Sequence, residues 1–189
     1  YLMNQLVFKF PFKTRYFEQD FYVSNNNFAV YQLIESWPNW PSKWINIFGD
    51  TGSGKTHLSK ILEKKIKKLK LIKAKDVNDK ILQKLHTNEC LIIDNYHNDI
   101  EEKLFYSILN QSKQLESYIV VNSTYPVKKT KFNLKDLKSR IDSFIRIGIE
   151  LPTDDLLKVI ISKSFLDKQI NVNPKISEYI IKNVERSYE

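Results

Sequence analysis

One run of eight residues has the composition of a phosphate-binding loop. Residues 49–56 read Gly-Asp-Thr-Gly-Ser-Gly-Lys-Thr and match the pattern G-x-x-x-x-G-K-[ST] at every position. The glycines let the backbone curl closely enough for successive N–H groups to point at phosphate oxygens. Lys55 can neutralise the β- and γ-phosphates, and the Thr56 hydroxyl can ligate Mg²⁺. The pattern predicts that ATP or ADP is bound with Mg²⁺ by Gly49, Asp50, Thr51, Gly52, Ser53, Gly54, Lys55, Thr56 and the adjoining His57.

An acidic residue at the end of an apolar run is the expected companion of this loop. Leu91-Ile-Ile-Asp94 has the form of a buried strand that ends in a carboxylate, and Asp94 can hold the Mg²⁺ or its waters. An ordinary strand-ending aspartate is the alternative. The segment between Lys55 and Asp94 has room for a helix, another strand and a short helix. The acidic strand is therefore not the next one in sequence, which argues against the simplest nucleotide-kinase layout.

The residue after Asp94 lacks the group that hydrolysis requires. Asn95 occupies the position where many ATPases of this design carry a Glu or Asp that polarises the attacking water. An amide cannot accept that proton. Slow intrinsic hydrolysis is therefore expected, unless Glu101, Glu102 or a partner supplies the base.

The elements that must position these residues alternate along the chain. Short apolar runs indicate strands at 45–48, 69–74, 90–93, 118–121 and 144–149, and helical spacing indicates helices at 28–37, 54–68, 78–85, 101–115, 134–141 and 153–167, with another from 174. Such alternation predicts an α/β fold with a parallel sheet and helices on both faces. The expected organisation is an extended tail over 1–20, a nucleotide-binding α/β domain over 21–151 and a helical piece over 152–189.

Composition limits which other classes of protein the chain could belong to. The formal charge of +8 invites a nucleic-acid interpretation, but six lysines against Glu63 within residues 57–70 supply most of it. The favoured interpretation of residues 57–70 is an amphipathic helix whose solvent-exposed face is rich in lysine. Direct DNA binding is therefore expected to be weak or absent. Cys90 is the only cysteine, which excludes an intrachain disulfide. No apolar stretch reaches the roughly 20 residues of a membrane span. We expect a cytoplasmic protein with no membrane partner.

The ordered set of motifs resembles a known family. It is similar to the AAA+ domain of DnaA, and within that group to the Hda-type regulators, which lack the DNA-binding domain. The resemblance covers nearly the whole chain and is carried by GDTGSGKTHL, LIIDN, VVNST, LKDLKSRI and LPTDDLLKVIISKSF, with a WPNWP loop and an ending FLDKQINVNP…VERS typical of alphaproteobacterial members. It implies a P-loop AAA+ fold in which residues 152–189 form the first part of a helical lid.

Several positions take roles from this resemblance alone. Arg140 matches the arginine finger, which reaches the nucleotide of a neighbouring subunit; a surface arginine near a helix end is the alternative. Thr124 or Asn122 matches the residue that senses the γ-phosphate, with the register open. Tyr22 and Val23 fall near the segment that borders adenine, or they pack in the core.

The beginning of the chain carries a further pattern. Residues 5–10 read Gln-Leu-Val-Phe-Lys-Phe and look like the short motif with which Hda-type and other bacterial replication proteins bind the sliding clamp. A strand that bears a glutamine amide and alternating apolar anchors suits a peptide groove. The resemblance assigns clamp binding to Gln5, Leu6, Phe8 and Phe10. A first β-strand folded onto the core is the alternative.

Taken with the resemblance, these residues give one leading hypothesis. The chain is expected to be an Hda-like negative regulator of chromosomal replication initiation, which binds adenine nucleotide and the sliding clamp and promotes hydrolysis of DnaA-bound ATP through Arg140. The resemblance also leaves room for a homo-oligomer. The alternatives are a DnaA-like initiator domain and an ATPase that loads a helicase. A nucleotide kinase is disfavoured, because Arg140 stands alone and no arginine-rich lid lies between the central strands.

Overall fold

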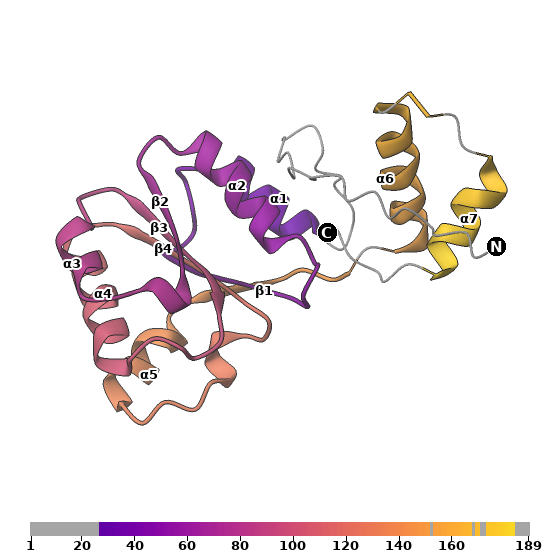
Figure 1. The fold of residues 1–189 in the computed structure, drawn as a ribbon. Helices are drawn as coiled ribbons and strands as arrows, with labels where there is room; N and C mark the ends of the chain where they lie inside the picture. The colour runs from indigo at the N-terminus through magenta and orange to yellow at the C-terminus, as the bar shows by residue number, and fades with distance from the viewer. Residues whose placement is uncertain (1–26, 152, 168, 171–172, 184–189) are drawn as a thin grey trace, which may run out of the picture.

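The computed structural model describes residues 27–151, 153–167, 169–170 and 173–183 (Figure 1). The positions expected to bind the clamp (Gln5, Leu6, Phe8 and Phe10) or to border adenine (Tyr22 and Val23) lie outside these ranges. In chain order the elements are α1 (Phe28–Glu35), β1 (Trp44–Phe48), α2 (Lys55–Lys65), β2 (Leu69–Lys73), η2 (Ala74–Asp76), α3 (Lys80–Lys84), β3 (Cys90–Tyr96), α4 (Glu102–Gln114), β4 (Tyr118–Ser123), η3 (Val127–Lys129), α5 (Lys135–Asp142), β5 (Ile145–Gly148), α6 (Asp154–Asp167) and α7 (Pro174–Asn183).

The sheet has five strands in the order β2-β3-β4-β1-β5, and every neighbouring pair is parallel. The predicted parallel sheet is therefore confirmed. Strand β4 lies between β1, which leads into the glycine loop, and β3, which carries Asp94. Because the carboxyl ends of parallel strands share one edge, residues at the end of β4 lie between the glycine loop and Asp94.

Helices cover both faces of the sheet, as the alternation of elements predicts (Figure 1). Successive residues of β3 point to opposite faces: Ile92 packs with the helices α1 and α2, whereas Leu91 and Ile93 pack with α3, α4 and α5. The buried partners are Leu58, Ile61 and Leu62 on the first face and Phe105, Ile108, Leu109 and Leu137 on the second. Each such side chain contributes about 1.5–3 kcal/mol of hydrophobic stabilisation, so the central strands are fixed from both sides.

The last two helices form a separate packing unit beyond β5. Helices α6 and α7 contact one another, and Figure 1 shows them apart from the sheet, in orange and yellow. Thr153 begins α6 as the sequence predicts: its Oγ1 accepts a hydrogen bond from the Leu156 N–H at 3.4 Å. Leu156 and Leu157 are buried, whereas Leu166 and Tyr179 are strongly exposed. No helix in the described part of the chain combines the length and apolarity needed to cross a bilayer.

Candidate nucleotide-binding site

The glycine loop begins where three strands end together. Gly49 follows β1, and its N–H donates to the Ser123 carbonyl at the end of β4 at 3.2 Å. On the other side, the Ile149 N–H just after β5 donates to the Phe48 carbonyl at 2.8 Å. A Cβ at Gly49 would lie 2.3 Å from the Ile149 carbonyl oxygen and 2.8 Å from the Ser53 hydroxyl. Only glycine fits at this position, and the start of the loop is fixed against both neighbouring strands.

The other two glycines set the curvature of the loop. Gly52 and Gly54 have φ angles of 79° and 90°, a left-handed conformation that glycine adopts without steric cost. Gly54 is the residue before α2, so the helix begins directly at Lys55. The backbone N–H groups and positive dipole end of the first turn of α2 therefore face the loop, which is the arrangement that binds phosphate at helix N-termini.

The Lys55 ammonium group lies inside the loop. Its Nζ donates to the carbonyl oxygens of Gly49 at 2.6 Å and Asp50 at 2.8 Å, and to the Ser53 hydroxyl at 3.3 Å. Asp50 and Thr51 are exposed, whereas Gly52 and Ser53 are buried. The positive charge is thus held at the concave side of a backbone turn, where a polyphosphate would also meet the loop amides.

Thr56 and Asp94 meet across the sheet edge. The Thr56 hydroxyl donates to Asp94 Oδ2 at 3.1 Å, and Asp94 is only 7% exposed. Hydroxyl and carboxylate oxygens are ligands that Mg²⁺ prefers, and this pair fits that ion. Among the described residues, no group of three or more His, Cys, Asp or Glu side chains is placed so that it could hold a metal ion by itself. Such a small donor set suits a cation that nucleotide phosphates and water also hold.

Strand β4 adds a buried amide to this pair. Asn122 is fully buried, and its Nδ2 donates to Asp94 Oδ1 at 2.8 Å and to the Ser59 hydroxyl at 2.7 Å. Thr124 follows β4, is half-buried, and lies 3.5 Å from His97 Nε2 through its hydroxyl. The two sensing candidates therefore have different surroundings: Asn122 touches the acid, and Thr124 lies farther out at the strand end.

Sequence reasoning missed Ser59. Ser59 stands four residues after Lys55, is buried among apolar neighbours of α2, and donates its hydroxyl to the Lys55 carbonyl at 3.1 Å. A serine on the apolar face of a helix was the available signal. His97 is exposed, and its Nδ1 lies 2.9 Å from the Asn95 carbonyl oxygen. His57 lies half-buried in the first turn of α2.

The residue that directly follows Asp94 is an amide, not a carboxylate. Asn95 is exposed and has a left-handed φ of 59°, at a point where the pairing of β3 with β4 becomes irregular. The Glu102 carboxylate accepts hydrogen bonds from the backbone N–H groups of Asn133 and Leu134, at 3.0 and 2.7 Å. Glu102 therefore holds the segment that leads into α5, while Glu101 is exposed at the start of α4.

Arg140 lies on the face of the sheet opposite to α2. It belongs to α5, is half-buried, and its Nε donates to Asn110 Oδ1 on α4 at 3.1 Å. The structure therefore brings Lys55, Thr56 and Asp94 together but directs Arg140 to a different surface. Arg140 and Arg146 are the arginines in the part of the chain that the structure describes.

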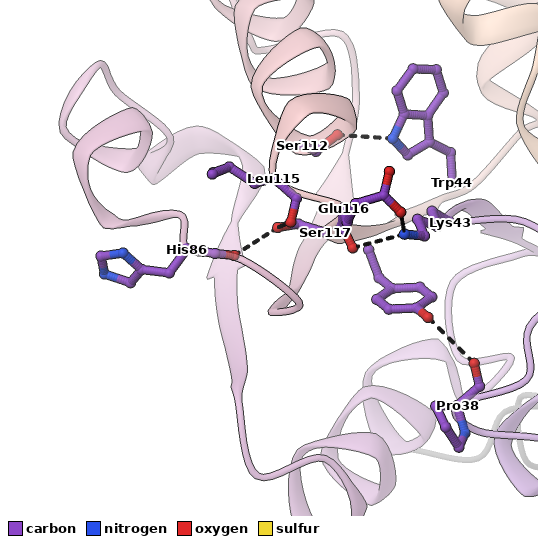
Figure 2. Close-up of polar contacts among 9 residues, drawn as sticks. Pro38, Lys43, Trp44, His86, Ser112, Leu115, Glu116 and Ser117 are labelled. Atoms are coloured by element: carbon purple, nitrogen blue, oxygen red, sulfur yellow. Dashed lines mark hydrogen bonds and ion pairs between the residues drawn. The ribbon is translucent and has the colours of Figure 1, made fainter.

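Polar and aromatic contacts fix the opposite, amino end of the sheet (Figure 2). The Trp44 indole donates to the Ser112 hydroxyl at 2.9 Å, the Ser117 hydroxyl donates to the His86 carbonyl at 2.7 Å, and Lys43 pairs with Glu116. The rings of Trp37 and Trp40 lie 4.7 and 5.5 Å from that of Tyr118. These aromatic residues support the sheet.

Burial determines the chemistry of two neutral groups of β3. It raises the pKa of the Cys90 thiol, which is fully buried and thus unsuited to act as a nucleophile. The pKa of Tyr96 is also raised, by burial first and then by the charges of Asp99 and Glu102. Neither group takes part in the site.

No curated protein is similar to the chain at a significant level. A family model described as RNA helicase matches residues 45–144, which is more than half of the 189 residues. The chain belongs to the RNA helicase family. The matched range contains the glycine loop, Asp94, Asn122 and Arg140.

Solved structures show which fold this is. AMPPCP-bound DnaA from Aquifex aeolicus has a TM-score of 0.74 and 21% identity, covering 90% of this chain and 61% of that one. Domain III of the Thermotoga maritima replication initiation protein DnaA has a TM-score of 0.71 and 18% identity, with 90% and 81% covered. A Thermotoga maritima RuvB mutant has a TM-score of 0.67 and 20% identity, with 88% and 59% covered.

These likenesses confirm the predicted P-loop AAA+ fold. The chain spans about three fifths of the length of the Aquifex aeolicus DnaA structure.

Proposed function

We propose that this chain is an Hda-like negative regulator of chromosomal replication initiation that works in the cytoplasm. In this proposal it binds ADP or ATP with Mg²⁺, docks on the sliding clamp, and promotes hydrolysis of DnaA-bound ATP. The observation that carries the proposal is a complete phosphate-holding set, Lys55, Thr56 and Asp94, beside Asn95, which has no carboxylate to activate water.

The chain's own site is suited to holding a nucleotide. The loop amides and Lys55 would bind the phosphates, and Thr56 and Asp94 would hold Mg²⁺ or its waters. The ion, when bound, neutralises negative charge on the phosphates. Asn95 cannot take the proton of an attacking water, and Glu102 is engaged by the Asn133 and Leu134 backbone. Nucleotide bound here would serve as a structural and switching ligand.

Arg140 would act on a partner. Its guanidinium group is held by Asn110 on the face of the sheet that α4 and α5 cover, whereas the phosphate-binding helix α2 packs on the other face. This placement supports action in trans on DnaA-bound nucleotide, as the family resemblance implies. An arginine supplied in trans raises the rate of phosphoryl transfer by roughly 10³–10⁵.

The clamp contact is proposed for residues 5–10. Gln5, Leu6, Phe8 and Phe10 lie outside the described residues, so this part depends on the sequence pattern and on the family resemblance. An extended peptide with alternating anchors gains affinity from main-chain hydrogen bonds and specificity from its side chains. Tethering would bring Arg140 to DnaA wherever a clamp is loaded.

A nucleic-acid-dependent ATPase is the second candidate, because the matching family is described as RNA helicase and one similar structure is the replication initiator DnaA with AMPPCP and single-stranded DNA. An initiator domain and a helicase loader belong to this class. Such a protein would hydrolyse ATP faster when single-stranded DNA or RNA is added. The regulator would do so only with DnaA and the clamp present.

The test is ATP hydrolysis by DnaA on clamp-loaded DNA with added chain. Wild-type chain is expected to stimulate hydrolysis, and Arg140→Ala to remove the stimulation. Arg146→Ala is the matched control, because Arg146 is exposed on the edge strand β5 and its loss should leave stimulation intact. Leu6→Ala combined with Phe8→Ala should remove stimulation by preventing clamp binding. Equal stimulation by wild type and Arg140→Ala would overturn the proposal.

A further inference from the structure

One fully buried amide links the phosphate-binding helix to the acidic strand. Asn122 on β4 donates to Asp94 Oδ1 on β3 and to the Ser59 hydroxyl on α2. We propose that Asn122 is a positioning residue, which fixes the Asp94 carboxylate in the orientation that holds Mg²⁺ or its waters. This inference deepens the proposed nucleotide site and rests on it.

The orientation of the amide follows from its partners. Ser59 donates its own hydroxyl hydrogen to the Lys55 carbonyl, so it can only accept from Asn122. A carboxylate at Asp94 is also an acceptor. Both hydrogens of the Asn122 Nδ2 are therefore used, one for each neighbour. The reverse orientation would place the amide oxygen against two acceptors, which is unfavourable.

Packing alone does not account for an asparagine here. Within the described residues the Oδ1 atom of Asn122 is buried and has no hydrogen-bond partner. A buried acceptor without a partner is unfavourable, and an apolar side chain would fill the same place without that penalty. The neighbouring residues Val120 and Val121 of β4 show that the strand accommodates such side chains. The N–H groups directed at Asp94 and Ser59 are what the amide adds.

Together, Asn122 and Thr56 determine how Asp94 is presented. Each carboxylate oxygen accepts one hydrogen bond: Oδ1 from Asn122 and Oδ2 from Thr56. Two donors on two oxygens fix the plane of the carboxylate and leave the other lone pairs for a cation or its waters. Loss of the Asn122 donor would leave a nearly buried carboxylate held on one side only. Partners of this kind affect metal affinity by about 10–100-fold.

The test compares two substitutions of the same shape. Threonine and valine are both β-branched and suit a strand, but only threonine has a hydroxyl that can donate to Asp94. ADP affinity is measured by calorimetry in EDTA and at increasing Mg²⁺, with thermal melts of each protein. The Mg²⁺ midpoint is the Mg²⁺ concentration at which half of the gain in ADP affinity is reached. We expect Asn122→Val to raise this midpoint about tenfold or more and to leave the ADP affinity in EDTA unchanged. The midpoint of Asn122→Thr should lie closer to that of the wild type.

Two further variants separate positioning from folding. Ser59→Ala removes the other partner of Asn122 and should leave the Mg²⁺ midpoint near the wild-type value. In an Asp94→Asn background, Asn122→Val should cause no additional shift, because Asn122 acts through Asp94. If Asn122→Val does not fold, Asn122→Ala takes its place in the comparison with Asn122→Thr.

The outcomes distinguish this inference from the proposed function. If ADP affinity depends on Mg²⁺ in the same way in the wild type and in Asn122→Val, the positioning role is overturned and the nucleotide site stands. A lower melting temperature without any change in the Mg²⁺ midpoint would likewise reduce Asn122 to a structural residue. A wild-type protein that binds no nucleotide at any Mg²⁺ concentration would overturn both.

Discussion

Gly49→Ala tests whether the first glycine of the loop is required by close approach of the backbone. An added Cβ would lie 2.3 Å from the Ile149 carbonyl oxygen and 2.8 Å from the Ser53 hydroxyl. The closer atom belongs to the backbone at the end of β5, where the Ile149 N–H is bonded to Phe48 at 2.8 Å. To restore a separation of 3.0 Å, the strand end or the loop must move by 0.7 Å (3.0 − 2.3).

This movement should lower the free energy of unfolding by about as much as overpacking does in the cores of other proteins. Insertion of a methyl group against well-packed atoms costs roughly 1–3 kcal/mol. A loss of about 2 kcal/mol in a chain of this size lowers Tm by about 4–8 °C. The displaced loop amides also lose alignment with the phosphates. Loss of one charge-assisted hydrogen bond, about 1.5–3 kcal/mol, weakens ADP binding about tenfold or more.

Thermal melts and ADP calorimetry measure the two effects, and Gly148→Ala is the matched control. Gly148 ends the adjacent strand, and a Cβ there would meet only the Phe48 ring, at 3.1 Å. A ring edge can shift by a few tenths of an ångström, so we expect a change in Tm of less than about 2 °C and unchanged ADP affinity. The reasoning is refuted if Gly49→Ala and Gly148→Ala melt together and bind ADP equally.

Three other predictions concern β3 and its ends. Asn95→Asp should raise intrinsic ATP hydrolysis about a hundredfold, because a carboxylate can accept the proton of water and aspartate tolerates the φ of 59°; phosphate release equal to that of Asn95→Ala would contradict this. Burial acts to raise the pKa of Glu89, but hydrogen bonds from Lys70 and the His86 backbone hold it below its usual 4.5. The stabilisation by Glu89 is therefore present above pH 4.5 and lost as pH falls through the lowered pKa, so melts of Glu89→Gln should differ from wild type at pH 7 and converge with it in acid. The buried Cys90 thiol should react with a thiol reagent only on unfolding; rapid labelling of the native protein would contradict its burial.

Local patterns predicted the fold and the loop well. The glycine loop is contiguous, and its glycines have the φ angles and the close approach that the motif requires. The apolar run before Asp94 predicted a buried strand, but β3 continues to Tyr96, because pairing with β4 resumes after the irregularity that follows Ile93. Helix α2 ends at Lys65, three residues before the expected end, because Ile66 turns to an extended conformation and enters the core.

Contacts between strands were beyond the reach of the sequence. Whether Asn122 or Thr124 approaches Asp94 depends on the register of β4 against β3 and on which residue lies within the strand. The linking role of Ser59 depends on the rotation of α2 over β4, which no local spacing specifies. Arg140 could be named only from the family resemblance, because a lone arginine near a helix end has no chemical signature of its own.

Calorimetry with ADP and ATP in the presence of Mg²⁺, on wild type and on Lys55→Ala, tests the nucleotide site most directly. Lys55 places an ammonium group inside the loop, held by the carbonyl oxygens of Gly49 and Asp50. We predict binding to one site in the wild type and affinity weakened at least about tenfold in Lys55→Ala, since a charged hydrogen bond is worth about 1.5–3 kcal/mol. No heat with the wild type, or equal affinity in both proteins, would contradict the account.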